Sequence, residues 1–362
     1  MIKDTAQKFK VIRYCVATGL VPFLEALVVY SADTGPTPSE ITDVDVLGVR
    51  PADSAPLKRI IFDCKTLKTS AINRALWARG LASFILADEA FVILSKSVPE
   101  AHRLAGSQIG VRLFSEEIFD AYAQSANPSY SVPNSYIERP AAWETLYDIG
   151  SRYPALKKHL NLLQSSGPQI TDPAYGIRSL VASLKKIEGE IDPEKPEHRA
   201  VFLLTCMQLL LFFSELVRIF HNVFDPATKR EQFELTLRYY IWGGRENYDI
   251  RQRLKEAAAV SRGADPGVFE LPGWDTFVEV FRSLLDAPTL VGSTCLPTQD
   301  LAFREISVID QSLDKRLATR LSGNSRVRQF IGLAAQYVIS ASRLPRDFRA
   351  RLNQTLAELA SE

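Results

Sequence analysis

The chain has 362 residues, of which 46% are hydrophobic and 23% charged, and its 43 lysines and arginines against 42 acids leave a net charge of +1. This composition excludes a disordered or fibrous protein, and the small net charge excludes a global basic field for nucleic acid, so any such binding must come from local patches. Four scattered cysteines without a C-x-x-C pair exclude a zinc finger and indicate a reducing cytoplasm.

The first 125 residues predict an α/β domain. Strands are expected where β-branched and aromatic residues dominate or alternate with polar ones, and helices where apolar residues recur every three or four positions. In chain order these are a helix over residues 4–18, strands over 21–30, 41–49 and 59–65, a helix over 70–87, a strand over 91–95, a helix over 99–110, a strand over 111–114 and a helix over 116–124. We therefore expect a mixed central sheet flanked by helices.

The remainder of the chain predicts a second, all-α domain. Residues 126–140 are rich in proline, serine and asparagine, which indicates a linker or a long surface loop. Residues 141–362 follow, with helices expected over 141–151, 156–163, 176–190, 197–223, 229–242, 248–262, 274–285, 301–321, 325–342 and 347–360. The role of this domain stays open between recognition, regulation and assembly. Assembly would mean a homo-oligomer or a complex with a protein partner.

Residues 201–213 are almost entirely apolar, but they contain Thr205 and Gln208, and Glu215 and Arg218 follow closely. The run is shorter than the roughly 18 to 20 clean apolar residues of a membrane span, so we expect a buried core helix and no membrane partner. The N-terminus shows no apolar stretch of the kind found in a secretory signal, which favours the cytoplasm.

The residues that carry chemistry lie on two neighbouring strands. Asp43 and Asp45 alternate with apolar residues in one strand, and Asp63 and Lys65 do so in the next. Because burying unpaired charges is costly, Asp45, Asp63 and Lys65 are expected to converge on a cation such as Mg²⁺ or Mn²⁺. Without metal, the two carboxylates should repel each other, so removing one should not destabilise the domain. The plain alternative is a solvated edge strand, and Asp43 stays open between a supporting acid and an exposed charge.

This arrangement resembles the PD-(D/E)xK, or restriction-endonuclease-like, nuclease superfamily. The resemblance covers about the first 125 residues and rests on the order of elements and on the spacing of Asp45 and Asp63-Cys64-Lys65. It implies that Asp45 and Asp63 are catalytic metal ligands and that Lys65 is the catalytic lysine. It also implies a metal ligand from the backbone carbonyl of Cys64, with the thiol in the core.

Two positions depart from the pattern of the superfamily. Val44 stands where the superfamily often has proline, and the first helix lacks the usual glutamate, for which Glu25 on the following strand is the nearest catalytic candidate. A basic residue often lies over the site from the helix after the lysine, and Arg74 matches this best. Contacts to nucleic-acid phosphates are expected from Lys58, Arg59, Lys68 and Arg74.

The resemblance implies a prokaryotic Mg²⁺- or Mn²⁺-dependent nuclease that hydrolyses phosphodiester bonds, with DNA favoured over RNA, in restriction or anti-phage defence. Asp45 and Asp63 would hold the metal, and Lys65 would orient the attacking water and offset developing charge. Two alternatives stay open. One is a catalytically inactive protein of nuclease fold that binds nucleic acid or a protein partner, and the other is a helical scaffold with a structural N-terminal domain.

Overall fold

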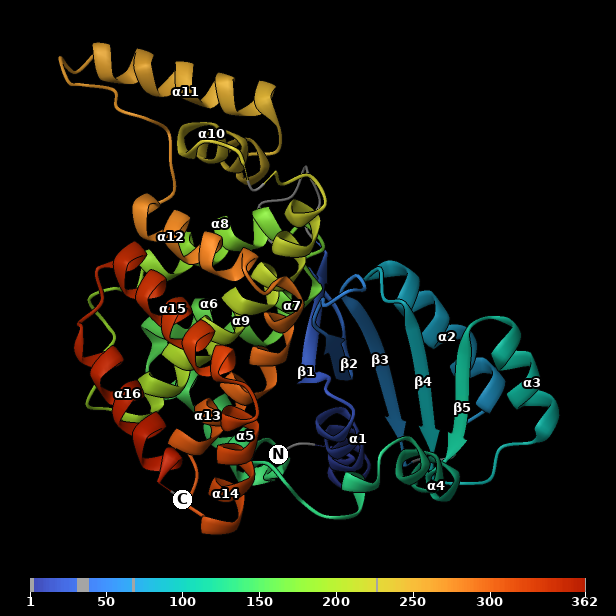
Figure 1. Ribbon diagram of the computed structural model, residues 1–362. Coiled ribbons are helices and arrows are strands. Elements are labelled where there is room, and N and C mark those ends of the chain that lie inside the picture. The colour runs from blue at the N-terminus through green and yellow to red at the C-terminus, as the bar shows by residue number, and fades with distance from the viewer. Residues whose placement is uncertain (1–2, 31–38, 67–68, 226, 362) are drawn as a thin grey trace.

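The computed structural model describes residues 3–30, 39–66, 69–225 and 227–361 (Figure 1). The first third of the chain forms a sheet with its own helices, and the rest forms a larger body of helices beside it. In Figure 1 the strands lie to the right, in blue to green, and the later helices lie to the left. The prediction of an α/β part followed by a helical part is therefore confirmed.

Within the described residues, five strands form one mixed sheet in the order β1-β2-β3-β4-β5. They are β1 (Val21–Tyr30), β2 (Ser39–Arg50), β3 (Lys58–Lys65), β4 (Glu89–Leu94) and β5 (Val111–Ser115). The first three strands pair antiparallel, whereas β3, β4 and β5 pair parallel and are joined by helices. Each strand predicted from the sequence is present, with small shifts at the ends.

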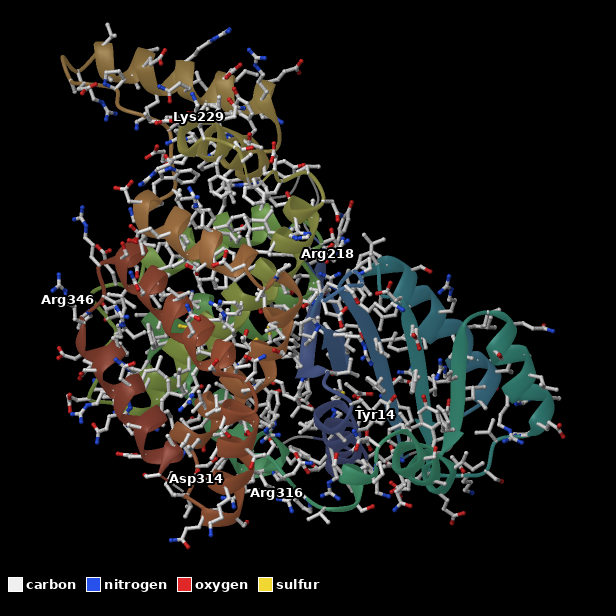
Figure 2. The ribbon with its side chains drawn as sticks, viewed as in Figure 1. Tyr14, Arg218, Lys229, Asp314, Arg316 and Arg346 are labelled. Atoms are coloured by element: carbon white, nitrogen blue, oxygen red, sulfur yellow. The ribbon has the colours of Figure 1, made fainter. Side chains whose placement is uncertain are left out.

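Helices cover both faces of this sheet. They are α1 (Thr5–Ala17), α2 (Ala71–Phe84), α3 (Glu100–Gln108) and α4 (Glu116–Ala126). On one face α1 packs with α4, and Tyr14, labelled in Figure 2, projects from α1. Its ring contacts the rings of Phe62, Phe91 and Phe119. Successive strand residues face opposite sides, so Asp63 points away from this cluster and towards α2.

The helical body begins at residue 140. Its helices are α5 (Pro140–Arg152), α6 (Lys157–Asn161), α7 (Gly167–Gln169), α8 (Pro173–Lys185), α9 (Pro196–His221), α10 (Arg230–Ile241), α11 (Arg245–Val260), α12 (Trp274–Leu285), α13 (Cys295–Glu305), α14 (Gln311–Ser322), α15 (Ser325–Ser342) and α16 (Asp347–Ala360). The prediction of a single helix over residues 301–321 is wrong, because α13 ends at Glu305. A new helix then starts where the Asp310 carboxylate accepts the Ser312 amide at 2.9 Å.

The long apolar helix α9 lies at the centre of this body. Among the described residues, α9 is the one helix that is both long enough and apolar enough to cross a membrane. Its mean hydropathy is 2.1 over an 18-residue window. However, 94% of that window is buried among α8, α12, α13 and α15. The prediction of a buried core helix is confirmed.

The segment 126–140 joins the two parts but is not a surface loop along its whole length. Ser135, Tyr136 and Ile137 are buried. The Asp300 carboxylate of α13 accepts the Ser135 hydroxyl at 2.7 Å and the Tyr136 amide at 2.8 Å, and the Tyr136 hydroxyl donates to Asp314 at 2.7 Å. The surface-loop interpretation is wrong here, because a buried aspartate holds the backbone in place.

The helical body also covers the free edge of the sheet at β1. The Tyr147 hydroxyl donates to the Leu24 carbonyl at 2.7 Å, and the Gln299 amide nitrogen donates to the Pro22 carbonyl at 2.8 Å. Exposed strand edges invite pairing with other chains, and these contacts block that edge. One continuous hydrophobic cluster therefore runs from the sheet into the helices.

Candidate active site

Charged side chains from three strands and two helices meet where β2 and β3 separate. The carboxylates are those of Glu25, Asp45 and Asp63, and the cations are those of Lys8, Lys65 and Arg74. Lys65 Nζ lies 3.1 Å from Asp45 Oδ2 and 3.5 Å from Asp63 Oδ1. The structure thus brings Asp45, Asp63 and Lys65 together as the sequence predicts. The solvated-edge alternative is wrong, because β3 lies inside the sheet and Asp63 is buried.

The geometry of β2 and β3 explains how Asp45 enters the site. Their pairing runs from Arg50 and Lys58 to Val46 and Phe62. Beyond this point the Asp45 carboxylate, rather than a backbone carbonyl, accepts the Cys64 amide at 2.8 Å. This hydrogen bond fixes Oδ2 of Asp45 on β3, and the other oxygen, Oδ1, faces Lys8 Nζ at 3.0 Å.

Glu25 reaches the cluster from β1 through an unusual backbone conformation. Its φ is 48°, in the left-handed region, although Leu24 and Ala26 on either side pair regularly with β2. A residue other than glycine pays of the order of 1–3 kcal/mol for such a conformation, which persists mainly where the surroundings demand it. The result is that the Glu25 carboxylate accepts a hydrogen bond from Lys8 Nζ at 2.8 Å.

Lys8 is the member of the cluster that the sequence reasoning missed. Its side chain is only 2% exposed, and Nζ lies 2.8 Å from Glu25 Oε1 and 3.0 Å from Asp45 Oδ1. A signal was available, because Lys8 lies one helical turn before the buried Ile12 and shares its face of α1. A lysine at a core position is rarely buried unless it is paired.

Arg74 of α2 binds Asp63 with two nitrogens, Nε and Nη2, one to each carboxylate oxygen. Its guanidinium also lies 3.7 Å from the centre of the Trp77 ring. This two-pronged contact fixes the orientation of the carboxylate. The structure directs this guanidinium to Asp63, and the expected phosphate contact of Arg74 stays a prediction.

Burial and ion pairing oppose each other at these groups. Burial acts to raise the pKa of Asp45, but Lys8 and Lys65 outweigh it and hold that pKa below its usual value. At Asp63 burial prevails over Arg74 and Lys65, so the pKa is raised. Burial acts to lower the pKa of Lys8 and Lys65, yet their carboxylate partners raise both. Asp45 is thus the more firmly ionised of the two aspartates.

Cys64 lies between the two charged residues of β3 but faces the other side of the sheet. Its thiol is fully buried, and burial raises its pKa well above the usual value. A thiol in this state is not a nucleophile. The expectation that the thiol points into the core is met, and the metal-ligand role of the Cys64 carbonyl stays a prediction.

The other residues expected to contact phosphate divide clearly. Lys58 at the start of β3 is exposed. Arg59 is wrong as a phosphate contact, because it is buried and its guanidinium donates to the Pro168 carbonyl at 2.8 Å and to the Ile170 carbonyl. Lys68 lies outside the described residues.

The donor set fits a hard divalent cation by its chemistry. Asp45 and Asp63 present carboxylate oxygens to one shared ammonium, and such oxygens are the ligands that Mg²⁺ and Mn²⁺ prefer. Among the described residues no three acidic, histidine or cysteine side chains are gathered as ligands. Each carboxylate is instead paired with a lysine or an arginine. A bound metal ion would therefore have to share each carboxylate with that cation.

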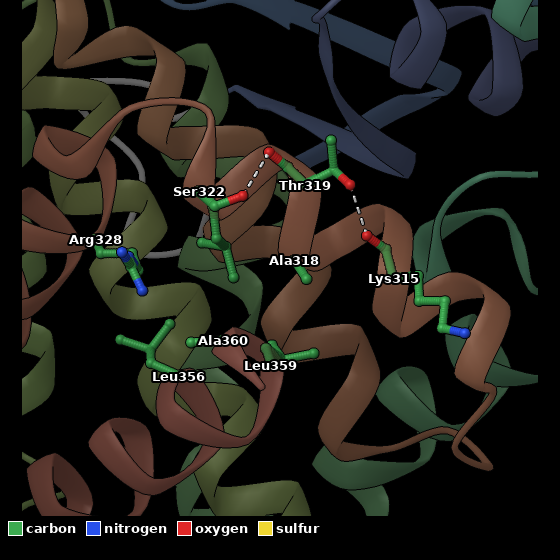
Figure 3. A pocket seen from close by; sticks show the side chains of 9 residues that line it. Lys315, Ala318, Thr319, Ser322, Arg328, Leu356, Leu359 and Ala360 are labelled. Carbon is green, nitrogen blue, oxygen red and sulfur yellow. Dashed lines mark hydrogen bonds between the residues drawn. The ribbon is translucent and has the colours of Figure 1, made fainter. Parts of the chain in front are cut away.

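Two cavities help to delimit the site. One of about 410 Å³ lies beside Glu25 and is lined by Asp43, Tyr147 and Lys157, and Asp43 is exposed there. Another of about 430 Å³ lies among α14, α15 and α16 (Figure 3). Its lining residues include no carboxylate, histidine or cysteine, and the Thr319 hydroxyl there donates to a helix carbonyl at 2.8 Å.

Comparisons of this chain with protein-family models, with curated proteins and with solved structures find no match.

Proposed function

We propose that this chain is a divalent-metal-dependent nuclease whose N-terminal domain has the restriction-endonuclease-like fold. The observation that carries the proposal is the position of Lys65, with its ammonium shared by Asp45 and Asp63 on neighbouring strands. A lysine beside two metal-binding carboxylates can orient the attacking water and offset the charge that develops in phosphodiester hydrolysis. The strand order and the helices between β3, β4 and β5 support the fold assignment.

Asp45 and Asp63 would hold Mg²⁺ or Mn²⁺, together with the Cys64 carbonyl that the resemblance implies. When bound, the ion supplies Lewis-acid chemistry and lowers the pKa of water. Lys65, which is 30% exposed, faces solvent enough to meet a phosphate oxygen and to orient a water molecule. Arg74 acts on the reaction through Asp63, whose carboxylate it holds in one orientation.

The proposed substrate is a nucleic acid, with DNA favoured over RNA. Since the net charge is only +1, affinity must come from local cations such as the exposed Lys58. The proposed setting is the cytoplasm of a prokaryote, in restriction or anti-phage defence. In this proposal the helical body serves recognition, regulation or assembly.

One observation favours a second candidate, a catalytically inactive protein of nuclease fold that binds nucleic acid or a protein. The three carboxylates are all paired with internal cations, so the cluster is stable without a metal ion. A catalytically inactive protein of this fold would need only these ion pairs to keep the cluster stable.

Cleavage assays separate the two candidates. Plasmid DNA, single-stranded DNA and RNA are incubated with the full chain in Mg²⁺, in Mn²⁺ and in EDTA, and with Asp63→Asn as the matched variant. The proposal expects products with metal that are absent both in EDTA and with Asp63→Asn. Binding without cleavage on every substrate would favour the inactive candidate.

A further inference from the structure

The ammonium of Lys8 occupies an unusual position for a lysine. It is buried from solvent by α1 and the sheet, and it lies between two carboxylates, at 2.8 Å from Glu25 Oε1 and 3.0 Å from Asp45 Oδ1. Burying an ammonium is costly unless close carboxylates compensate for the lost hydration. Here two of them do so from different strands.

The packing of α1, and not the flexibility of the lysine side chain, places Lys8 in this position. The neighbouring residues Val11, Ile12 and Cys15 fix α1 on the sheet, since all three are fully buried. On another face of the same helix, Lys10 contacts Glu116 and Asp120 of α4, each at 2.7 Å. The helix is therefore held on both sides, and Lys8 is directed inwards.

Glu25 is arranged to hold the ammonium from the other side. Its left-handed backbone turns the side chain of a strand residue onto Lys8. Lys8 thus engages Oδ1 of Asp45, while Oδ2 of the same carboxylate contacts Lys65 and the Cys64 amide. The two oxygens of Asp45 face two different positive groups, of which one is built in and buried.

We propose that the Lys8 ammonium takes the place of a second divalent ion between Glu25 and Asp45, so that the site binds a single divalent cation at Asp45 and Asp63. This inference rests on the proposed metal-dependent function. A fixed monovalent charge between two carboxylates performs the neutralising task of an ion, and it does so without being lost to solvent. Glu25 is then a positioning residue for Lys8 and not a metal ligand.

The number of bound Mn²⁺ ions tests this directly. Free Mn²⁺ is followed by electron paramagnetic resonance while the ion is titrated into the full chain, and ions that Asp45→Asn still binds are subtracted as surface ions. The wild type should bind one ion. Lys8→Met should bind two, because Glu25 and Asp45 then lack a cation, and the double variant Lys8→Met/Glu25→Gln should again bind one.

Lys10→Met is the matched control, because it changes a lysine of the same helix that contacts Glu116 and Asp120 instead. It should bind one ion. Circular dichroism shows whether Lys8→Met folds. If it does not, Glu25→Gln decides: a count of one with nearly unchanged affinity supports the inference, and a clear loss of affinity overturns it by making Glu25 a ligand.

The outcomes separate this inference from the function on which it rests. Two ions in the wild type, or one ion in folded Lys8→Met, would overturn the inference and leave the metal-dependent function standing. No ion in the wild type beyond the Asp45→Asn count would contradict the metal-dependent function, and the inference with it.

Discussion

Lys65 Nζ of β3 lies 3.1 Å from Asp45 Oδ2 of β2, across the point where the two strands cease to pair. The same carboxylate oxygen accepts the Cys64 amide at 2.8 Å. The separation of two strands therefore creates both the space and the hydrogen-bond donor that this buried aspartate needs. The site is a consequence of sheet geometry as much as of residue type.

Asp45→Asn should lower stability, contrary to the sequence expectation that removing one of two repelling carboxylates is harmless. The structure argues against that expectation, because Lys65 lies between Asp45 and Asp63 and the buried Lys8 also pairs with Asp45. Breaking a buried ion pair costs roughly 3–5 kcal/mol in the free energy of unfolding, since it leaves the Lys8 ammonium short of a partner. Urea unfolding measures the change. Glu89→Gln, which breaks the exposed pair with Arg112, should cost less than about 1 kcal/mol.

Arg59→Met and Lys58→Met, at adjacent positions of β3, should have opposite effects. Arg59→Met should lower the free energy of unfolding by roughly 1–3 kcal/mol, because the Pro168 and Ile170 carbonyls lose their donor. It should leave nucleic-acid affinity unchanged. Lys58→Met should leave stability unchanged and weaken binding in a salt-dependent way. Urea unfolding and a fluorescence-anisotropy titration separate the two, and a large loss of affinity in Arg59→Met without loss of stability would contradict its structural role.

Arg74→Lys should impair the site although it keeps the positive charge. A lysine cannot reproduce the two-pronged contact with Asp63 or the stacking on Trp77. If Asp63 binds metal, loss of its orienting partner should weaken Mn²⁺ binding by roughly 10- to 100-fold. A titration with Mn²⁺ checks this. Unchanged affinity would show that Asp63 is oriented without Arg74.

His159 should make the helical body sensitive to acid. Its ring is fully buried between the Ser183 and Thr205 hydroxyls, and burial lowers its pKa from 6.5 to about 4. Below pH 6.5 the His159 ring binds a proton in the unfolded chain but not in the folded chain. The free energy of unfolding therefore falls as the pH drops towards 4. At 1.36 kcal/mol per pKa unit the full loss is about 3 kcal/mol.

The measurement is urea unfolding at pH 7 and pH 4.5 for the wild type, His159→Gln and the control His221→Gln. His159→Gln should lose less stability on acidification than the wild type. His221 is exposed at the end of α9, so its replacement should follow the wild type. Equal losses in all three proteins would contradict the assignment to His159.

The sequence alone predicts much of the N-terminal part, because alternation along a strand reports directly which residues share a face. Asp45, Asp63 and Lys65 follow from this rule. Glu25 is the nearest catalytic candidate from the sequence for the glutamate that the first helix lacks, and the structure places Lys8 against its carboxylate. That contact depends on the left-handed backbone of Glu25, which no pattern in the sequence predicts.

The errors share a physical cause, namely contacts between residues far apart in the chain. Arg59 looks like a surface cation in its strand, and only the packing of residues 168–170 against the sheet buries it. Ser135 and Tyr136 lie in a stretch with the composition of a loop, yet Asp300 supplies the buried acceptor for both. Local composition carries no information about such partners.

Whether this cluster hydrolyses phosphodiester bonds is decided by the single-turnover cleavage rate of Lys65→Met. Enzyme in excess over an end-labelled DNA in Mg²⁺ isolates the chemical step, with Lys10→Met as the control. The expected result is a rate lowered by roughly 10²- to 10⁴-fold with DNA affinity nearly retained, as for the loss of a positioned catalytic group. Cleavage by Lys65→Met at the wild-type rate would contradict the account.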